Sequence, residues 1–155
     1  MSAYDPKKAA EVWKRVQSPF EAAPGPADLL AMITEERLDA VTYLHLSRFF
    51  RGSSGALLRR MSQQEQAHAT CLTGIYTLLT GERPKIRTLA VPKQAPQVLL
   101  RQCYGREMRA LARYQERASD PEYGQVFARL ANREQEHCQT LLLLLGSLPN
   151  KKPGS

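Results

Sequence analysis

One arrangement of acidic and imidazole side chains occurs twice in this 155-residue chain. Glu36 is followed by the motif Glu65-Gln66-Ala67-His68, and in the second half of the chain Glu107 is followed by Glu134-Gln135-Glu136-His137. A glutamate and a histidine three residues apart share one face of a helix. The repeat therefore predicts two similar helical hairpins that pack about a pseudo-twofold axis.

The rest of the sequence indicates four main helices. Helix-breaking residues gather at positions 24–26, 51–55, 81–96 and 119–121, and again from 146 onward. They leave four intervals of about 23 to 26 residues. Ala, Leu, Arg, Gln and Glu dominate these intervals, whereas β-branched residues are sparse. The sequence therefore predicts an all-α fold.

Local signals place several helix ends. Asp120 and Pro121 predict the start of the last helix, and Gly81 suits the end of the second. A shorter N-terminal helix is expected to begin at Asp5 and Pro6. The predicted organisation is an N-terminal helix and linker over residues 1–25, the four-helix bundle over 26–147 and a polar tail over 148–155.

Each main helix has an apolar stripe with residues spaced three or four apart, which predicts the side that faces the core. Acidic or imidazole side chains interrupt all four stripes, whereas no lysine or arginine does. The interrupting residues are Glu36, Glu65, His68, Glu107, Glu134 and His137.

These six side chains are expected to lie at one level of the bundle. Two residues of an antiparallel hairpin share a level when they are equally far from the turn. Glu36 and Glu65 are centred on the break at 51–55, and Glu107 and Glu134 on the break at 119–121. The segment from residue 81 to 93, at up to ~3.3 Å per residue, is long enough to return along the bundle. The second and third helices would then be parallel.

Burying six such groups is costly unless their charge is compensated. Two divalent cations would neutralise four glutamates, and each Glu-x-x-His pair presents a carboxylate and an imidazole to one ion. Mixed oxygen and nitrogen ligands favour iron or manganese over structural zinc, although zinc could bind adventitiously. The sequence therefore predicts two iron or manganese ions per chain.

Over about residues 27 to 146, this ligand set resembles that of the ferritin-like di-iron carboxylate superfamily, particularly its rubrerythrin-type members. The resemblance implies a four-helix bundle with a long crossover between the second and third helices. It also implies hydrogen bonds from Tyr43 and Tyr114 to the ligating carboxylates. The implied ligands are Glu36 and His68 at one metal, Glu107 and His137 at the other, and Glu65 and Glu134 as bridges.

The chain departs from rubrerythrins in two respects. Rubrerythrins carry a rubredoxin domain with cysteine-ligated iron, but Cys71, Cys103 and Cys138 form no CxxC pair. An external electron donor is therefore expected. Rubrerythrins also have a further glutamate one turn beyond the third-helix ligand, where this chain has Ala110.

The expected function is a redox reaction at a di-iron centre. A di-ferrous pair can reduce oxygen or hydrogen peroxide, so the chain would act as a ferroxidase or a peroxide reductase. The sequence leaves open whether it reduces peroxide, oxidises iron or stores it, and which metal is native. A homodimer is the expected assembly.

Two other functions have some support in the sequence. The net charge of +7 and the stripe formed by Arg106, Arg109, Arg113 and Arg117 suggest a helical bundle that binds or acts on nucleic acid. A solvated helix face explains these arginines equally well, and no aromatic residues alternate with them, so nucleic acid is not the expected partner. A metal-free interaction module is the other alternative, and the complete ligand set argues against it.

The sequence also bears on location. The longest uncharged stretch, residues 138–150, is too short and too mixed for a membrane helix. The N-terminal residues lack the apolar run of a secretory signal. We therefore expect a cytoplasmic protein without membrane contact.

Overall fold

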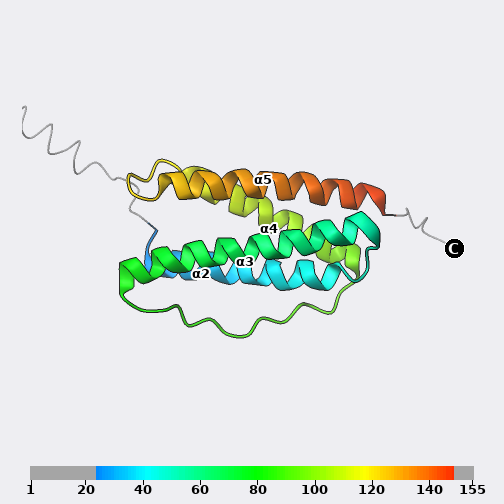
Figure 1. The fold of residues 1–155 in the computed structure, drawn as a ribbon, viewed down its shortest axis with the longest axis horizontal. Coiled ribbons are helices and arrows are strands. Elements are labelled where there is room, and N and C mark those ends of the chain that lie inside the picture. Colours follow the sequence, from blue (N-terminus) through cyan, green and yellow to red (C-terminus); the bar gives the residue numbers. More distant parts are fainter. Residues whose placement is uncertain (1–23, 149–155) are drawn as a thin grey trace, which may run out of the picture.

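The computed structural model describes residues 24–148, which form an all-helical bundle (Figure 1). Its helices are α2 (Pro26–Leu46), α3 (Gly52–Thr80), α4 (Pro96–Arg117) and α5 (Gly124–Ser147). No strand occurs within these residues, so the all-α prediction is confirmed for them. The predicted N-terminal helix and most of the predicted tail lie outside the described residues. None of the described helices is both long and apolar enough to cross a membrane.

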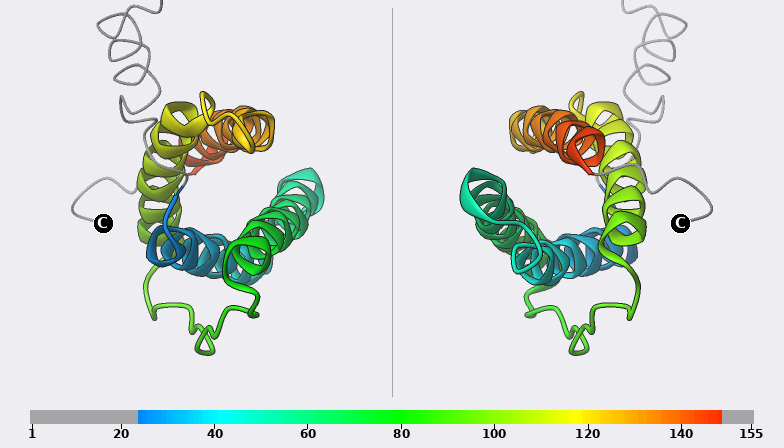
Figure 2. Two further views of the ribbon diagram at one scale, coloured as in Figure 1. Left: turned by 90° about the vertical axis from the view of Figure 1, so that its left-hand side faces the viewer. Right: turned by 90° about the vertical axis from the view of Figure 1, so that its right-hand side faces the viewer.

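The bundle consists of two hairpins. α2 packs against α3, and α4 packs against α5, more extensively than any other pair of helices. Viewed end on, the helices follow one another around the bundle in the order α3, α2, α4, α5 (Figure 2). The segment from residue 81 to 95 has no regular secondary structure and runs along the outside of the bundle between α3 and α4 (Figure 1).

The hydrophobic core is divided into two clusters along the length of the bundle. One cluster includes Ile33, Leu72 and Phe127, and the other includes Leu58 and Leu141. All five of these side chains have at most 4% of their surface exposed. All four helices contribute to the core, so the apolar stripes do face inward as their spacing predicts.

Two of the predicted helix starts are wrong. α3 begins at Gly52, inside the segment that was expected to be a break, because Gly52 is able to adopt a positive φ of 63°. α5 begins at Gly124 rather than at Pro121. Asp120 caps a turn instead, since its Oδ1 accepts hydrogen bonds from the backbone N–H groups of Glu122 and Tyr123. The end of α3 is as predicted, with Gly81 in the left-handed conformation at φ 73°.

The first turns of α3 and α5 each contain a glycine against which the preceding loop packs closely. A Cβ atom on Gly55 would lie 2.4 Å from the carbonyl oxygen of Phe50, and one on Gly124 would lie 2.4 Å from that of Ala118. Both neighbours are backbone atoms, which cannot move without shifting the loop. These two glycines extend the internal repeat to the turns of the hairpins.

We expect Gly55→Ala and Gly124→Ala each to destabilise the fold by about 1 to 3 kcal/mol, as overpacking does. Gly74→Ala is the matched control, because Gly74 lies in α3 with nothing within 4 Å of its would-be Cβ. Alanine there should stabilise the helix by about 0.5 to 1 kcal/mol. Urea denaturation of the three variants measures the change in the free energy of unfolding. Equal changes at the three positions would contradict the packing argument.

Candidate metal centre

All six predicted ligands are buried, and they meet between the two hydrophobic clusters. Their exposed fractions range from 1% to 6%. The structure brings them together in two groups, in each of which one potential ligand atom per residue lies within 4.8 Å of the others. Glu65 and Glu134 belong to both groups, as residues that bridge two ions would. The groups are Glu36, Glu65, His68 and Glu134, and Glu65, Glu107, Glu134 and His137.

His68 directs its Nδ1 atom toward three carboxylates from three helices. The distances are 2.9 Å to Glu134 Oε1, 3.0 Å to Glu65 Oε2 and 3.4 Å to Glu36 Oε2. Glu65 lies one turn before His68 on α3, whereas Glu36 and Glu134 come from α2 and α5. The imidazole thus joins acidic groups from both hairpins.

His137 occupies the corresponding place in the second hairpin. Its Nδ1 atom lies 2.6 Å from Glu65 Oε1 and 3.4 Å from both Glu107 Oε1 and Glu134 Oε2. The rings of His68 and His137 are nearly parallel, with centroids 5.9 Å apart. The two imidazoles therefore stand side by side with the same nitrogen turned inward.

Several of these buried atoms have no hydrogen-bond partner. They are Glu65 Oε1, both carboxylate oxygens of Glu134 and His137 Nδ1. Glu65 Oε1 and His137 Nδ1 are only 2.6 Å apart, yet their orientation does not make a hydrogen bond. Leaving such groups unsatisfied costs about 1 to 3 kcal/mol each, and more when they are charged. Oxygen and nitrogen atoms that converge in this way suit divalent cations, so these residues fit the predicted metal pair.

Two tyrosines donate hydrogen bonds to Glu36 and Glu107, the two carboxylates that each belong to only one of the groups. Tyr43 on α2 donates a hydrogen bond to Glu107 Oε1 on α4, and Tyr114 on α4 donates one to Glu36 Oε1 on α2. Both phenols are buried, and burial together with the neighbouring glutamates raises their pKa well above the ordinary value. They therefore remain protonated donors. The two hydrogen bonds are reciprocal, so α2 and α4 are related by the pseudo-twofold axis that the repeat predicts.

The carboxylates titrate differently according to their neighbours. Burial, followed by the nearby carboxyl group of Glu134, raises the pKa of Glu107 to about 7. Burial and then the charge of Glu107 raise the pKa of Glu65 well above its usual value. Burial opposes ionisation of Glu36 and Glu134 as well, but the neighbouring carboxyl and imidazole groups outweigh it and lower the pKa of both. The first two glutamates thus keep protons more readily than the other two.

The imidazoles hold protons strongly when no cation is present. Burial lowers the pKa of His68, but the nearby carboxylates of Glu134, Glu36 and Glu65 outweigh it and raise the value to about 12. The pKa of His137 is raised in the same way by Glu107, Glu134 and Glu65. A cation that binds at Nδ1 must therefore displace a proton.

Beside these residues lies a buried ion pair that the sequence pattern does not predict. Arg106 Nε donates to Asp39 Oδ1 at 2.7 Å, and Arg106 Nη2 lies 3.3 Å from Cys103 Sγ. Asp39 is only 5% exposed and lies one turn after Glu36. Its position three residues beyond an inward glutamate could have identified it, but its partner lies on another helix.

Three of the four arginines in the basic stripe on α4 form ion pairs with α2. Besides Arg106, Arg113 lies 3.0 Å from Glu35 and Arg117 lies 3.4 Å from Asp28. These contacts give the stripe a structural role within the chain. They also reduce the positive charge that it could offer to nucleic acid.

A groove of about 530 Å³ between α3 and α5 reaches His68. Basic side chains and the exposed Cys71 lie along it. Its lining residues are Gln64, Ala67, His68, Cys71, Arg129, Leu130, Asn132, Arg133 and Glu136.

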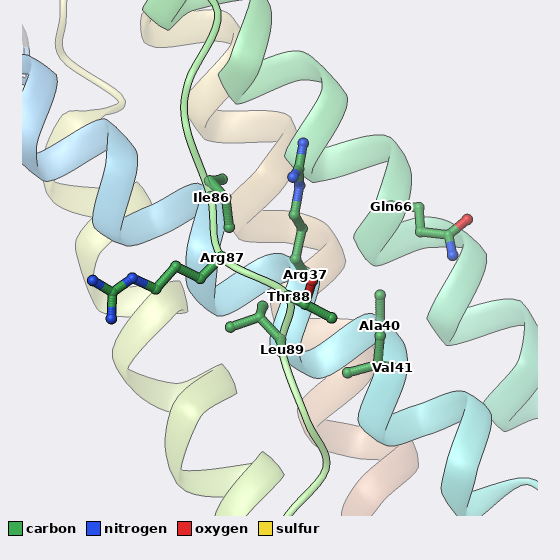
Figure 3. Close-up of a pocket in the computed structure, with 8 residues that line it drawn as sticks. All are labelled: Arg37, Ala40, Val41, Gln66, Ile86, Arg87, Thr88 and Leu89. Carbon is green, nitrogen blue, oxygen red and sulfur yellow. The ribbon is translucent and has the colours of Figure 1, made fainter.

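A second pocket, of about 420 Å³, lies on another side of the bundle (Figure 3). Residues 86–89 of the connecting segment line it together with Arg37 and Val41 of α2 and Gln66 of α3. None of the predicted ligands lines this pocket. Of these two pockets, the groove between α3 and α5 is the one that a predicted ligand, His68, lines.

Cation binding should weaken as the pH falls. Because the pKa of Glu107 is raised to about 7, below that pH its carboxyl holds a proton that the cation must displace. We expect the apparent affinity for Zn²⁺ to be at least about tenfold lower at pH 6 than at pH 8. Calorimetry in two buffers of different ionisation enthalpy measures both the affinity and the released protons. Equal affinity at both pH values, with no proton release, would contradict this expectation.

Comparison with known proteins adds no family to this description. No protein-family model matches the chain, and no curated protein matches it either. Any functional assignment therefore rests on the residues themselves and on their arrangement.

Proposed function

We propose that this chain is a di-iron redox protein of the ferritin-like, rubrerythrin type. It binds two iron ions, or manganese ions, and couples ferrous oxidation to the reduction of oxygen or hydrogen peroxide. The observation that carries the proposal is the pair of overlapping buried clusters that share Glu65 and Glu134 and contain unsatisfied ligand atoms. Metal-free interaction modules have no need for such atoms.

The proposed ligand roles follow the two clusters. Glu36 and His68 hold one ion, Glu107 and His137 hold the other, and Glu65 and Glu134 bridge them. When bound, two ferrous ions would supply the two electrons that, together with two protons, reduce one hydrogen peroxide molecule to two water molecules. Ligands of this kind, from all four helices at one level, are typical of ferritin-like bundles.

The surrounding side chains orient the proposed ligands and exclude water from the centre. The Tyr43 hydroxyl binds one carboxylate oxygen of Glu107, and the Tyr114 hydroxyl binds one of Glu36. In each carboxylate the other oxygen is left free for a cation. The apolar clusters above and below exclude water, which strengthens the electrostatic interactions within the centre. The groove beside His68 offers small oxidants a path inward.

The path of the chain supports the ferritin-like assignment. Hydrogen bonds between Tyr43 and Glu107 and between Tyr114 and Glu36 require α2 and α4 to be antiparallel. α3 and α4 then run in the same direction, which needs a long connection such as residues 81–95 (Figure 1). An external electron donor and a homodimer remain part of the proposal.

The first test is anaerobic titration of the full chain with ferrous iron, followed by addition of peroxide or air. We expect two irons per chain and a ferric absorption that appears on oxidation. Fast turnover with peroxide and an added reductant would indicate a peroxide reductase, and uptake far beyond two irons would indicate storage. Absence of iron binding would refute the proposal.

Replacing either bridging residue tests the ligand assignment. Glu65→Ala and Glu134→Ala should each lower the stoichiometry below two irons per chain and abolish the ferric pair, since both residues belong to both clusters. Glu136→Ala is the matched control, because Glu136 is exposed, pairs with Arg133 and belongs to neither cluster. It should keep two irons. Circular dichroism would show that each variant is folded, and two irons in Glu65→Ala would rule out the bridging role.

A further inference from the structure

We propose that Gln64 is a positioning residue that orients His137, and that it makes the two metal positions unequal so that the position at His137 fills first. This inference rests on the proposed function. It concerns the order and strength of binding rather than the redox reaction.

The outer nitrogen of His137 has a defined partner. Nε2 lies 2.8 Å from Gln64 Oε1, across the seam between α5 and α3. The amide oxygen only accepts hydrogen bonds, so His137 donates its Nε2–H to it. With the Nε2 proton held by Gln64, Nδ1 is the nitrogen whose proton a cation would displace, and this atom has no hydrogen-bond partner inside the cluster. Partners of this kind fix the orientation and tautomer of a ligating histidine.

His68 lacks the equivalent contact, because the internal repeat is broken at this position. Gln64 immediately precedes Glu65, and the residue that immediately precedes Glu134 is Arg133. A guanidinium group cannot accept a hydrogen bond, and Arg133 pairs with Glu136 at 2.7 Å instead. Among the described residues, no side chain accepts a hydrogen bond from Nε2 of His68, which lines the groove.

The two positions therefore differ in how well their histidines are held. An oriented imidazole loses less freedom when a cation binds, and loss of such a partner typically lowers metal affinity by about 10- to 100-fold. The position at His137 is the tighter one. The position at His68 is the weaker one and lies beside the groove, so it is the one that exchanges with ions from solution.

Titration of the metal-free full chain with Co²⁺, followed by visible absorption and calorimetry, tests this order. For the unmodified chain we expect two binding steps whose affinities differ by at least about tenfold. Gln64→Leu should weaken the first step by about 10- to 100-fold and merge the two steps, with two ions still bound. Gln64→Glu keeps an acceptor oxygen and should restore the separation.

Gln66→Leu is the matched control. Gln66 lies on the same helix, but it is exposed and lines the other pocket, which none of the predicted ligands lines (Figure 3). The same substitution there should leave both steps unchanged. His137→Ala should remove the tight step, whereas His68→Ala should remove the weak one.

The outcomes separate this inference from the proposed function. If the unmodified chain binds no Co²⁺, both are overturned. If it binds two ions and Gln64→Leu leaves both affinities unchanged, only the role of Gln64 is overturned. The same holds if His137→Ala removes the weak step instead of the tight one.

Discussion

The burial of four carboxylates at one level of the bundle is the constraint on which the rest of this structure depends. Like charges repel strongly away from water, and each buried group that lacks a partner destabilises the fold. Two imidazoles and two phenols, which come from all four helices, contact these carboxylates and offset part of the cost. The atoms that remain without partners are the ones that divalent cations would satisfy. The side chains that must be stabilised for the chain to fold are thus the same ones to which we assign the proposed chemistry.

The same groups help to hold the hairpins together. α3 and α5 pack against each other far less than either packs against its hairpin partner. Contacts across this seam include His68 with Glu134, His137 with Glu65, and His137 with Gln64. Ions held by both Glu65 and Glu134 would join α3 and α5 at this seam. Metal binding would then be linked to the closure of the bundle, because both would use the same side chains.

The pseudo-twofold symmetry holds for some of the contacts in the two halves and is broken at others. The tyrosine–glutamate contacts and the close-packed glycines Gly55 and Gly124 occur in both halves. Asp39 occurs in one half only, where it forms a buried pair with Arg106 beside Glu107. Departures of this kind distinguish two positions that the repeat alone would make equal.

The sequence by itself determined the helical class, the six inward polar residues and their common level. Each of these follows from local rules: helix propensity, the spacing of side chains along one helix, and equal distances from a turn. It did not reveal that α3 begins at Gly52, which adopts a positive φ, or that Asp120 caps a turn before α5 by accepting hydrogen bonds from Glu122 and Tyr123. The pairs Asp39–Arg106 and Gln64–His137 join residues on different helices, 67 and 73 positions apart. Only the tertiary structure determines these pairs, because the spacing of residues along one helix does not indicate which side chains of a second helix lie against it.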